Sequence, residues 1–364
     1  MILKYLFAFV MIFCIFLTAC AAATHEDEPE VYDYSEYENE LTSGYSDTED
    51  SIPPDFIMIG RERFSTSMTE LSLSRRNLSN EDIIPLRYMT NLTFLDLWSN
   101  QISDLTPLAE LIYLETLLLD SNRIRDITPL AGLTNLTRLN LGFNRINDIT
   151  PLADLTNLTE LELGLNRIND ITPLAGLTAL DWLSLYNNRI RDLTPLAGLT
   201  DLYWLSLHTN RISDLTPLAG LTELEGLSLR NNQISDLTPL AELTSLESLE
   251  LTSNQINDIT ALAGLTGLDW LSLHFNQISD ITPLAELIYL ESLFLNNNQI
   301  SDITPLANLT NLTQLVLSNN QITDIASLAG LLNFTGNTTL LFLDGNPITD
   351  WSPVEHFANV SGRP

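Results

Sequence analysis

The sequence predicts a repeat solenoid of the α/β type, a curved array with parallel strands on its concave face and short 3-10 or helical turns on its convex face. Leucines at alternate positions precede a recurring asparagine, and a Thr-Pro-Leu-Ala turn follows it. The asparagine returns every 22 residues, at Asn100, Asn122, Asn144, Asn166, Asn188, Asn210, Asn232, Asn254, Asn276, Asn298 and Asn320.

Each unit reads close to L-x-x-L-x-L-x-x-N-x-I-x-D-[LI]-T-P-L-A-x-L-T, as in "LTRLNLGFNRINDITPLADLT". The central leucines are expected to enter the core from a strand, and the residues between them to face outward. The asparagine amide is expected to satisfy backbone groups of neighbouring turns that an apolar core cannot. In the return segment, Thr172 is expected to act as an N-cap and Pro173 to occupy the first helical position.

This pattern resembles the leucine-rich repeat, and more closely the 22-residue bacterial variety found in internalins. The resemblance covers about Met68 to Phe357. It implies a single right-handed array that recognises a partner through its concave face.

The two ends depart from the repeat. Arg76 stands in the asparagine position of the first unit, and Phe56 to Arg76 are expected to form an N-terminal cap with its own strand. Residues 56–90 are thus the cap and a divergent first repeat, 91–330 the regular repeats, and 331–364 the last repeat and a C-terminal cap that includes Trp351.

The N-terminus has the layout of a bacterial lipoprotein signal over residues 1–19, with an apolar run that ends in "LTAC". This tetrapeptide resembles the lipobox, so Cys20 is the expected lipidation site and the protein is expected outside the cytoplasm, anchored by lipid to a bacterial membrane. An ordinary cleaved signal and an uncleaved anchor are the alternatives. Residues 20–55 carry the cysteine and an acidic tether without Lys or Arg, which is expected to be disordered.

The formal net charge of -31 argues against a nucleic acid or an anionic membrane surface as the main partner. Cleavage before Cys20 would leave the acylated cysteine as the only one in the mature chain, so we expect no disulfide. Stability must then come from the core.

No cofactor, metal or catalytic constellation is predicted. Two of the four histidines lie two residues after a serine, in the pairs Ser206–His208 and Ser272–His274, but no acid is placed to complete a triad. An aspartate also recurs in each repeat from Asp104 to Asp324, and again at Asp350. We interpret it as a cap for the following backbone amides, with calcium binding as the alternative.

The residue after the asparagine is arginine in five consecutive units and glutamine in most others. The aspartate three residues later is the expected neutraliser, and the alternative is a grip on an acidic or glycan partner. The five are Arg123, Arg145, Arg167, Arg189 and Arg211.

Large aromatic residues occupy several outward strand positions. The repeat places Trp182 beside Trp204, and Tyr186 beside His208 with Arg230 next in the row. We interpret these five as one aromatic and basic patch, since such residues dominate interface energetics, and add Trp98, Trp270 and His274 as further candidates. The sequence thus predicts non-catalytic binding of a protein. The alternatives are a glycan ligand, a purely structural surface component, and aromatic pairs that only stabilise the sheet.

Overall fold

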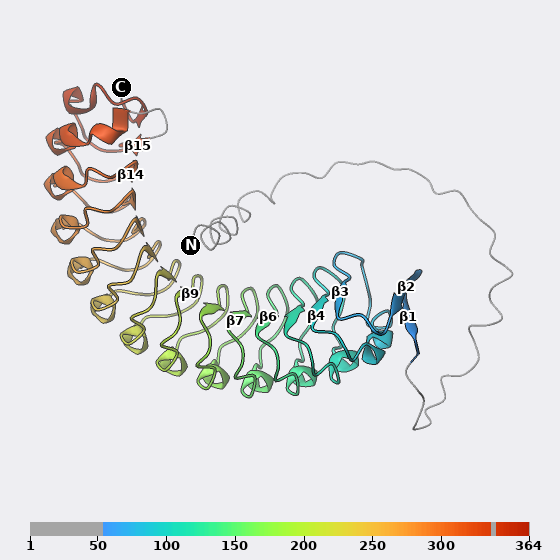
Figure 1. The fold of residues 1–364 in the computed structure, drawn as a ribbon. Helices are drawn as coiled ribbons and strands as arrows, with labels where there is room; N and C mark the ends of the chain where they lie inside the picture. The colour runs from blue at the N-terminus through green and yellow to red at the C-terminus, as the bar shows by residue number, and fades with distance from the viewer. Residues whose placement is uncertain (1–53, 336–339, 364) are drawn as a thin grey trace, which may run out of the picture. The chain divides into compact units, whose positions relative to one another are not determined.

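The computed structural model describes residues 54–335 and 340–363, where 14 strands form one sheet and each strand pairs in parallel with the next. The predicted solenoid is confirmed: strands line the inner side of a curved array and 3-10 turns its outer side (Figure 1). The strands are β3 (Glu70–Ser72), β4 (Phe94–Asp96), β5 (Thr116–Leu118), β6 (Arg138–Asn140), β7 (Glu160–Glu162), β8 (Trp182–Ser184), β9 (Trp204–Ser206), β10 (Gly226–Ser228), β11 (Ser248–Glu250), β12 (Trp270–Ser272), β13 (Ser292–Phe294), β14 (Gln314–Val316), β15 (Leu340–Phe342) and β16 (Val360–Ser361).

The core is a continuous stack of leucine and isoleucine side chains. Each three-residue strand has a central leucine, such as Leu183 in β8, that points inward and lies directly beside its equivalent Leu205 in β9. Leu185 and Ile190 continue the buried set of the same repeat. Because every repeat contributes equivalent side chains at the same depth, neighbouring repeats bury each other's apolar surface.

The return segments are single 3-10 turns: η1 (Ile84–Tyr88), η2 (Thr106–Leu108), η3 (Thr128–Leu130), η4 (Thr150–Leu152), η5 (Thr172–Leu174), η6 (Thr194–Leu196), η7 (Thr216–Leu218), η8 (Thr238–Leu240), η9 (Thr260–Leu262), η10 (Thr282–Leu284), η11 (Thr304–Asn308), η12 (Ala326–Gly330), η13 (Leu332–Thr335) and η14 (Ser352–Val354). None of these helices, within the described part of the chain, is long and apolar enough to cross a membrane.

The turns are capped by aspartate, and the expectation that threonine is the N-cap is wrong. Thr172 is the first residue of η5 and its side chain caps nothing, whereas Asp170 Oδ1 accepts the Thr172 backbone N–H at 2.9 Å. A carboxylate two residues before the turn reaches this amide more readily than the threonine's own hydroxyl can. Hydrogen bonds from the side chain and backbone of Thr172 lower the pKa of Asp170. The capping interpretation of the aspartates is thereby confirmed.

The asparagine ladder is structural, as predicted. Asn188 Nδ2 donates to the carbonyl oxygens of Leu163, Leu185 and Tyr186 at 3.0, 3.0 and 3.2 Å. Its Oδ1 accepts the Ile168 N–H at 2.9 Å, so one amide joins two successive repeats. The Asn188 side chain is buried together with most of these partners.

Replacing Asn188 with alanine is expected to lower the free energy of unfolding by about 1 to 3 kcal/mol, because backbone groups lose their partner in a buried site. Denaturation midpoints and hydrogen exchange of the Ile168 amide would measure the effect. The matched control is Asn169→Ala, which removes an exposed asparagine from the same loop region. Equal midpoints and equal exchange for both variants would contradict the structural role.

The N-terminal cap contains more structure than one strand. Strands β1 (Phe56–Ile59) and β2 (Glu62–Ser65) form an antiparallel hairpin that turns at Gly60, whose φ is 61°. Arg76, which replaces the ladder asparagine, pairs with Glu62 at 2.6 Å and thereby ties the hairpin to the first repeat.

The C-terminal cap ends in an unpredicted strand. β16 pairs with β15 through Leu341 and Val360, so the sheet continues past the last repeat. Trp351 packs against the core at this end, which agrees with its expected place in the cap. The edge of the array is thus covered by a strand and a partly buried tryptophan.

Candidate functional site

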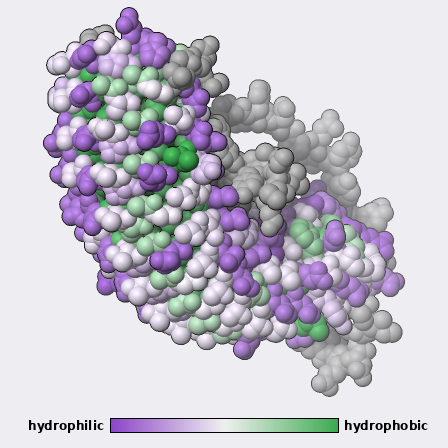
Figure 2. Space-filling model, turned by 60° about the vertical axis from the view of Figure 1, so that its left-hand side comes forward, coloured by the Kyte–Doolittle hydropathy of each residue, from purple (hydrophilic) through white to green (hydrophobic). Residues whose placement is uncertain are grey.

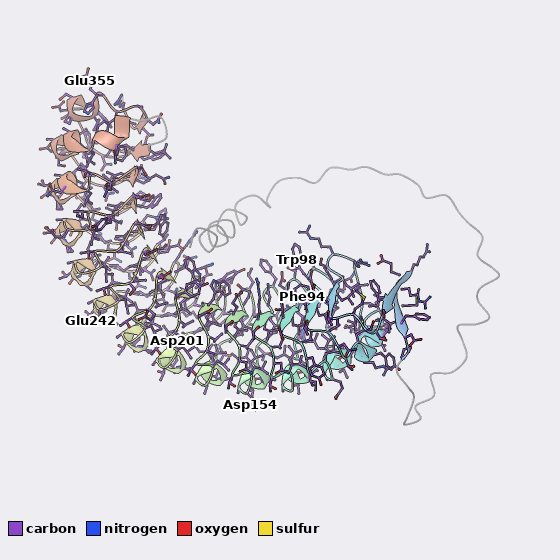
Figure 3. All side chains as sticks on the ribbon, in the orientation of Figure 1. Phe94, Trp98, Asp154, Asp201, Glu242 and Glu355 are labelled. Carbon is purple, nitrogen blue, oxygen red and sulfur yellow. The ribbon has the colours of Figure 1, made fainter. Side chains whose placement is uncertain are left out.

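The concave face displays the residues on either side of each central strand leucine. Phe94 and Trp98 lie on this strand side, whereas Asp154 and Glu242 lie among the turns on the opposite side (Figure 3). On the face seen in Figure 2, hydrophobic residues are interspersed with hydrophilic ones and no single apolar patch dominates.

Two tryptophans lie side by side at the middle of the sheet. Trp182 and Trp204 are direct partners in the register of β8 and β9, as the 22-residue spacing predicts, and both are half-buried. The Trp204 ring lies across Gly226: a Cβ on this glycine would be 2.1 Å from the ring. Gly226 thus provides the space that holds the ring flat against the sheet.

A second aromatic pair lies at the ends of the same strands. The rings of Tyr186 and His208 stack with centroids 4.6 Å apart and an interplanar angle of 20°. Tyr186 also covers Gly164, where an added Cβ would be 2.1 Å from the ring. Burial and the nearby Arg230 lower the pKa of His208 to about 4. This histidine is therefore neutral at pH 7, and Arg230 alone gives this group its positive charge.

The structure thus groups Trp182, Trp204, Tyr186, His208 and Arg230 on adjacent repeats. We call these five residues the concave cluster. Arg230 is exposed and the four rings are partly exposed, so a ligand can reach all of them.

A carboxylate beneath Tyr186 was not singled out from the sequence. Glu162 accepts the Gly164 N–H through Oε1. Burial, with a smaller contribution from Asp120, raises the pKa of Glu162 to about 7. Its signal in the sequence was weak, because Glu162 is one acid among many in an acidic chain.

The other three predicted residues lie apart from the concave cluster. Trp98 lies in an early repeat, where the Arg75 guanidinium is 4.0 Å from its ring centroid. Trp270 lies near Phe294 with centroids 5.6 Å apart, and His274 contacts Phe275 edge to face. The structure therefore separates these candidates into an N-terminal site and a C-terminal group.

One serine–histidine pair does form, but its geometry suits packing. Ser272 Oγ lies 2.8 Å from His274 Nδ1, and Thr252 Oγ1 lies within 3.1 Å of the same nitrogen. Ser272 is only 1% exposed, so a substrate cannot approach its hydroxyl. In the other pair, His208 Nδ1 lies 3.3 Å from Thr209 Oγ1, and no hydrogen bond joins it to Ser206 within the described residues. Both sites are best described as hydrogen-bonded networks on the sheet.

No cluster of three or more potential metal ligands occurs among residues 54–335 and 340–363. The recurring aspartates instead direct one carboxylate oxygen each to a turn amide, as at Asp126 and Asp148. Their chemistry here is capping.

The arginine row forms no ion pair with these aspartates within the described residues, and the expected balance of its charge by them stays a prediction. The ion pairs within the described residues are Arg76–Glu62 and Arg138–Glu160, and neither belongs to the row. The aspartate carboxylates are turned toward their threonines, and the arginine side chains extend into solvent.

The four most exposed large apolar or aromatic side chains of the described residues were not predicted as candidates from the sequence. Phe143 and Phe275 are both 54% exposed, and Tyr113 and Tyr289 are 57% and 60% exposed. Each departs from the small or polar residue usual at its repeat position. That departure was the signal that could have identified them.

Comparison with known proteins agrees with this architecture. The family described as "Leucine Rich repeats (2 copies)" matches residues 114–154, 134–176, 178–220, 222–264, 266–308 and 290–330. A sequence search among curated proteins gave no significant match.

Among solved structures, an internalin (inlF) from Listeria monocytogenes is 39% identical over 84% of this chain and 91% of its own, with a TM-score of 0.79. The LRR protein LIC12759 of Leptospira interrogans shares the fold, at 24% identity over 76% of this chain and 80% of its own, with a TM-score of 0.67. So does the plant peptide hormone receptor RGFR1, solved in complex with RGF2, at 21% identity over 81% of this chain and 55% of its own, with a TM-score of 0.68. The chain belongs to the leucine-rich-repeat family, and its array is internalin-like.

Proposed function

We propose that this chain is a non-catalytic binding protein that recognises a protein partner through the concave cluster. The observation that carries the proposal is the placement of Trp182, Trp204, Tyr186 and His208 as two in-register aromatic pairs beside Arg230. Tryptophan, tyrosine and arginine contribute the largest energies in protein interfaces. Leucine-rich-repeat proteins commonly mediate protein–protein binding, and their fold is a typical non-enzymatic scaffold.

The aromatic pairs are also held in place before a partner arrives. Gly226 and Gly164 leave room for the rings to lie against the sheet, and stacking fixes Tyr186 on His208. Rings that are already ordered lose little conformational entropy on binding. This preorganisation supports recognition by the cluster, in addition to its contribution to the sheet.

Crosslinking of the purified protein to a native bacterial envelope, followed by affinity measurement with the recovered partner, tests the proposal. Trp182→Ala and Trp204→Ala are each expected to weaken binding by at least ~2 kcal/mol, about 30-fold. The control Tyr113→Ala removes an exposed aromatic side chain away from the concave cluster and is expected to bind normally. Unchanged affinity of both tryptophan variants would refute the proposal.

The alternative is a glycan ligand, which can be tested with the same purified protein and bacterial envelope. Sugar rings stack on aromatic faces, so a soluble envelope glycan that binds here would change the tryptophan fluorescence. If the glycan quenches the fluorescence of wild type but not of Trp182→Ala, and no protein partner is recovered, the ligand of the concave cluster is a glycan and not a protein.

We further propose that lipid on Cys20 anchors the chain on the outer side of a bacterial membrane. Cys20 and residues 21–53 of the acidic tether lie outside the described residues, so this proposal rests on the "LTAC" sequence. Cys20→Ala is expected to abolish incorporation of a labelled fatty acid, because the acyl acceptor is gone. Cys14→Ala is the matched control and is expected to keep the label. Equal labelling of wild type and Cys20→Ala would show that Cys20 carries no lipid.

A further inference from the structure

A row of exposed arginines follows the asparagine ladder along one edge of the array. Five of them directly follow a ladder asparagine, and two more lie two residues further on. They account for seven of the 16 basic residues of a chain whose net charge is -31. We call this set the arginine flank: Arg123, Arg125, Arg145, Arg167, Arg189, Arg191 and Arg211.

The backbone fixes the spacing of the arginine flank. The Arg145 N–H donates to Ile124 O and the Arg167 N–H donates to Ile146 O, both at 2.8 Å. The same bond recurs for Arg189, so each arginine is tied to the repeat before it. Neighbouring parallel strands are about 4.8 Å apart. The backbone positions of successive arginines in the flank therefore have a similar spacing.

The side chains of the arginine flank remain available to a binding partner. None of the seven side chains takes part in an ion pair or hydrogen bond found within the described residues, although Arg76 and Arg138 do pair with glutamates elsewhere. The five aspartates of these repeats, such as Asp170, are hydrogen-bonded to turn threonines. Within the described residues these five carboxylates form no ion pair with the seven exposed arginines, although their lowered pKa keeps them ionised.

Two apolar residues each lie two positions before an arginine of the flank, in the same turn of the chain. Phe143 and Leu165 follow strands β6 and β7 and have φ values of 53° and 55°. Their repeats are hydrogen-bonded neighbours, because the Phe143 N–H donates to Gly164 O at 2.9 Å. Left-handed conformations disfavour bulky side chains, and Phe143 is 54% exposed. Neither local conformation nor core packing accounts for a phenylalanine here.

We infer that the arginine flank, together with Phe143 and Leu165, binds an acidic polypeptide segment that also carries apolar side chains. A planar guanidinium can donate two parallel hydrogen bonds to the two oxygens of one carboxylate. An apolar side chain on the partner would cover Phe143 and Leu165, which a polyphosphate or a sulfated sugar cannot do equally well. This site follows the ends of the strands and shares no residue with the concave cluster.

The chain itself indicates which substitutions preserve the fold. Glutamine occupies the position of Arg145, Arg167 and Arg189 in six other repeats, and serine occupies the position of Phe143 in several. The triple variant Arg145→Gln/Arg167→Gln/Arg189→Gln and the single variant Phe143→Ser therefore introduce residues that this fold already accommodates. Arg87→Gln is the control, since it removes an exposed arginine outside the flank.

The experiment measures binding of fluorescent poly(Glu,Tyr), poly-Glu and polyphosphate to the full-length protein by anisotropy, at low and high salt. Wild type and Arg87→Gln are expected to bind poly(Glu,Tyr) more tightly than poly-Glu, with weaker binding in high salt because the charges are exposed. The triple variant is expected to bind poly(Glu,Tyr) at least ~10-fold more weakly. Phe143→Ser is expected to remove most of the preference for the tyrosine-containing polymer.

The outcomes separate this site from the concave cluster. Trp182→Ala is expected to retain poly(Glu,Tyr) binding, so failure of the proposed concave recognition would leave this result unchanged. Equal binding by wild type and the triple variant, or no binding of poly(Glu,Tyr) at low salt, would overturn the inference. Tighter binding of polyphosphate than of poly(Glu,Tyr) would also overturn it, in favour of a phosphate-bearing polymer.

Discussion

Leu205→Ala is expected to lower the free energy of unfolding by about 2 to 5 kcal/mol, because it leaves a cavity in a closely packed stack. Trp204→Ala, one residue earlier on β9, is expected to cost only about 1 kcal/mol. Leu205 is fully buried and its register partners on β8 and β10 are Leu183 and Leu227. Trp204 is half-buried on the concave face, where its ring rests on Gly226.

Denaturant unfolding combined with hydrogen exchange would measure this contrast. A solenoid can open locally, so exchange of the amides in β8 to β10 is needed beside the global midpoint. The pair Leu183→Ala and Trp182→Ala repeats the comparison on the adjacent strand. Tryptophan variants that unfold as early as the leucine variants would identify both rings as parts of the scaffold and remove the main support for recognition by the concave cluster.

The fold could be predicted because a fixed period determines which residues become neighbours. A spacing of 22 residues places Trp182 beside Trp204 and stacks Tyr186 next to His208. The asparagine ladder was predictable for the same reason, since a buried amide must have partners in adjacent turns.

Features that depend on side-chain direction or on irregular sequence were harder to predict. Thr172 and Asp170 are both suitable caps by composition, and only the turn geometry favours the aspartate. Ion pairing of the arginine row depended on where the aspartate carboxylates point. β16 follows a stretch without the leucine period, so Val360 gave no strand signal.

The charge state of Glu162 on the concave face was equally hard to predict from the sequence, because it depends on burial. Glu162 ends β7 beneath the Tyr186 ring, and Gly164, two residues later, donates its N–H to the carboxylate. Burial dominates over this hydrogen bond and raises the pKa of Glu162 from 4.5 to about 7. The folded protein therefore binds a proton at Glu162 that the unfolded chain releases near pH 4.5.

This difference predicts a stability that falls as pH rises. The contribution of Glu162 is most favourable below pH 4.5, declines as pH increases toward 7, and above 7 reaches a constant penalty on the order of 3 kcal/mol. Glu162→Gln keeps the shape and an oxygen that accepts the Gly164 N–H, but carries no charge. The variant is therefore expected to be more stable than wild type at pH 8 and nearly equal to it at pH 4.

Denaturant midpoints of both proteins at pH 4 and pH 8 test this expectation. Glu223→Gln, which neutralises an exposed carboxylate, is the control for the change in net charge and is expected to have little effect at either pH. A Glu162→Gln variant whose stability differs from wild type by the same amount at both pH values would show that Glu162 does not titrate with a raised pKa. A gain in stability confined to pH 8 would show that Glu162, which lies beneath Tyr186, titrates near neutrality. Partner binding by the concave cluster would then be expected to vary with pH near neutrality.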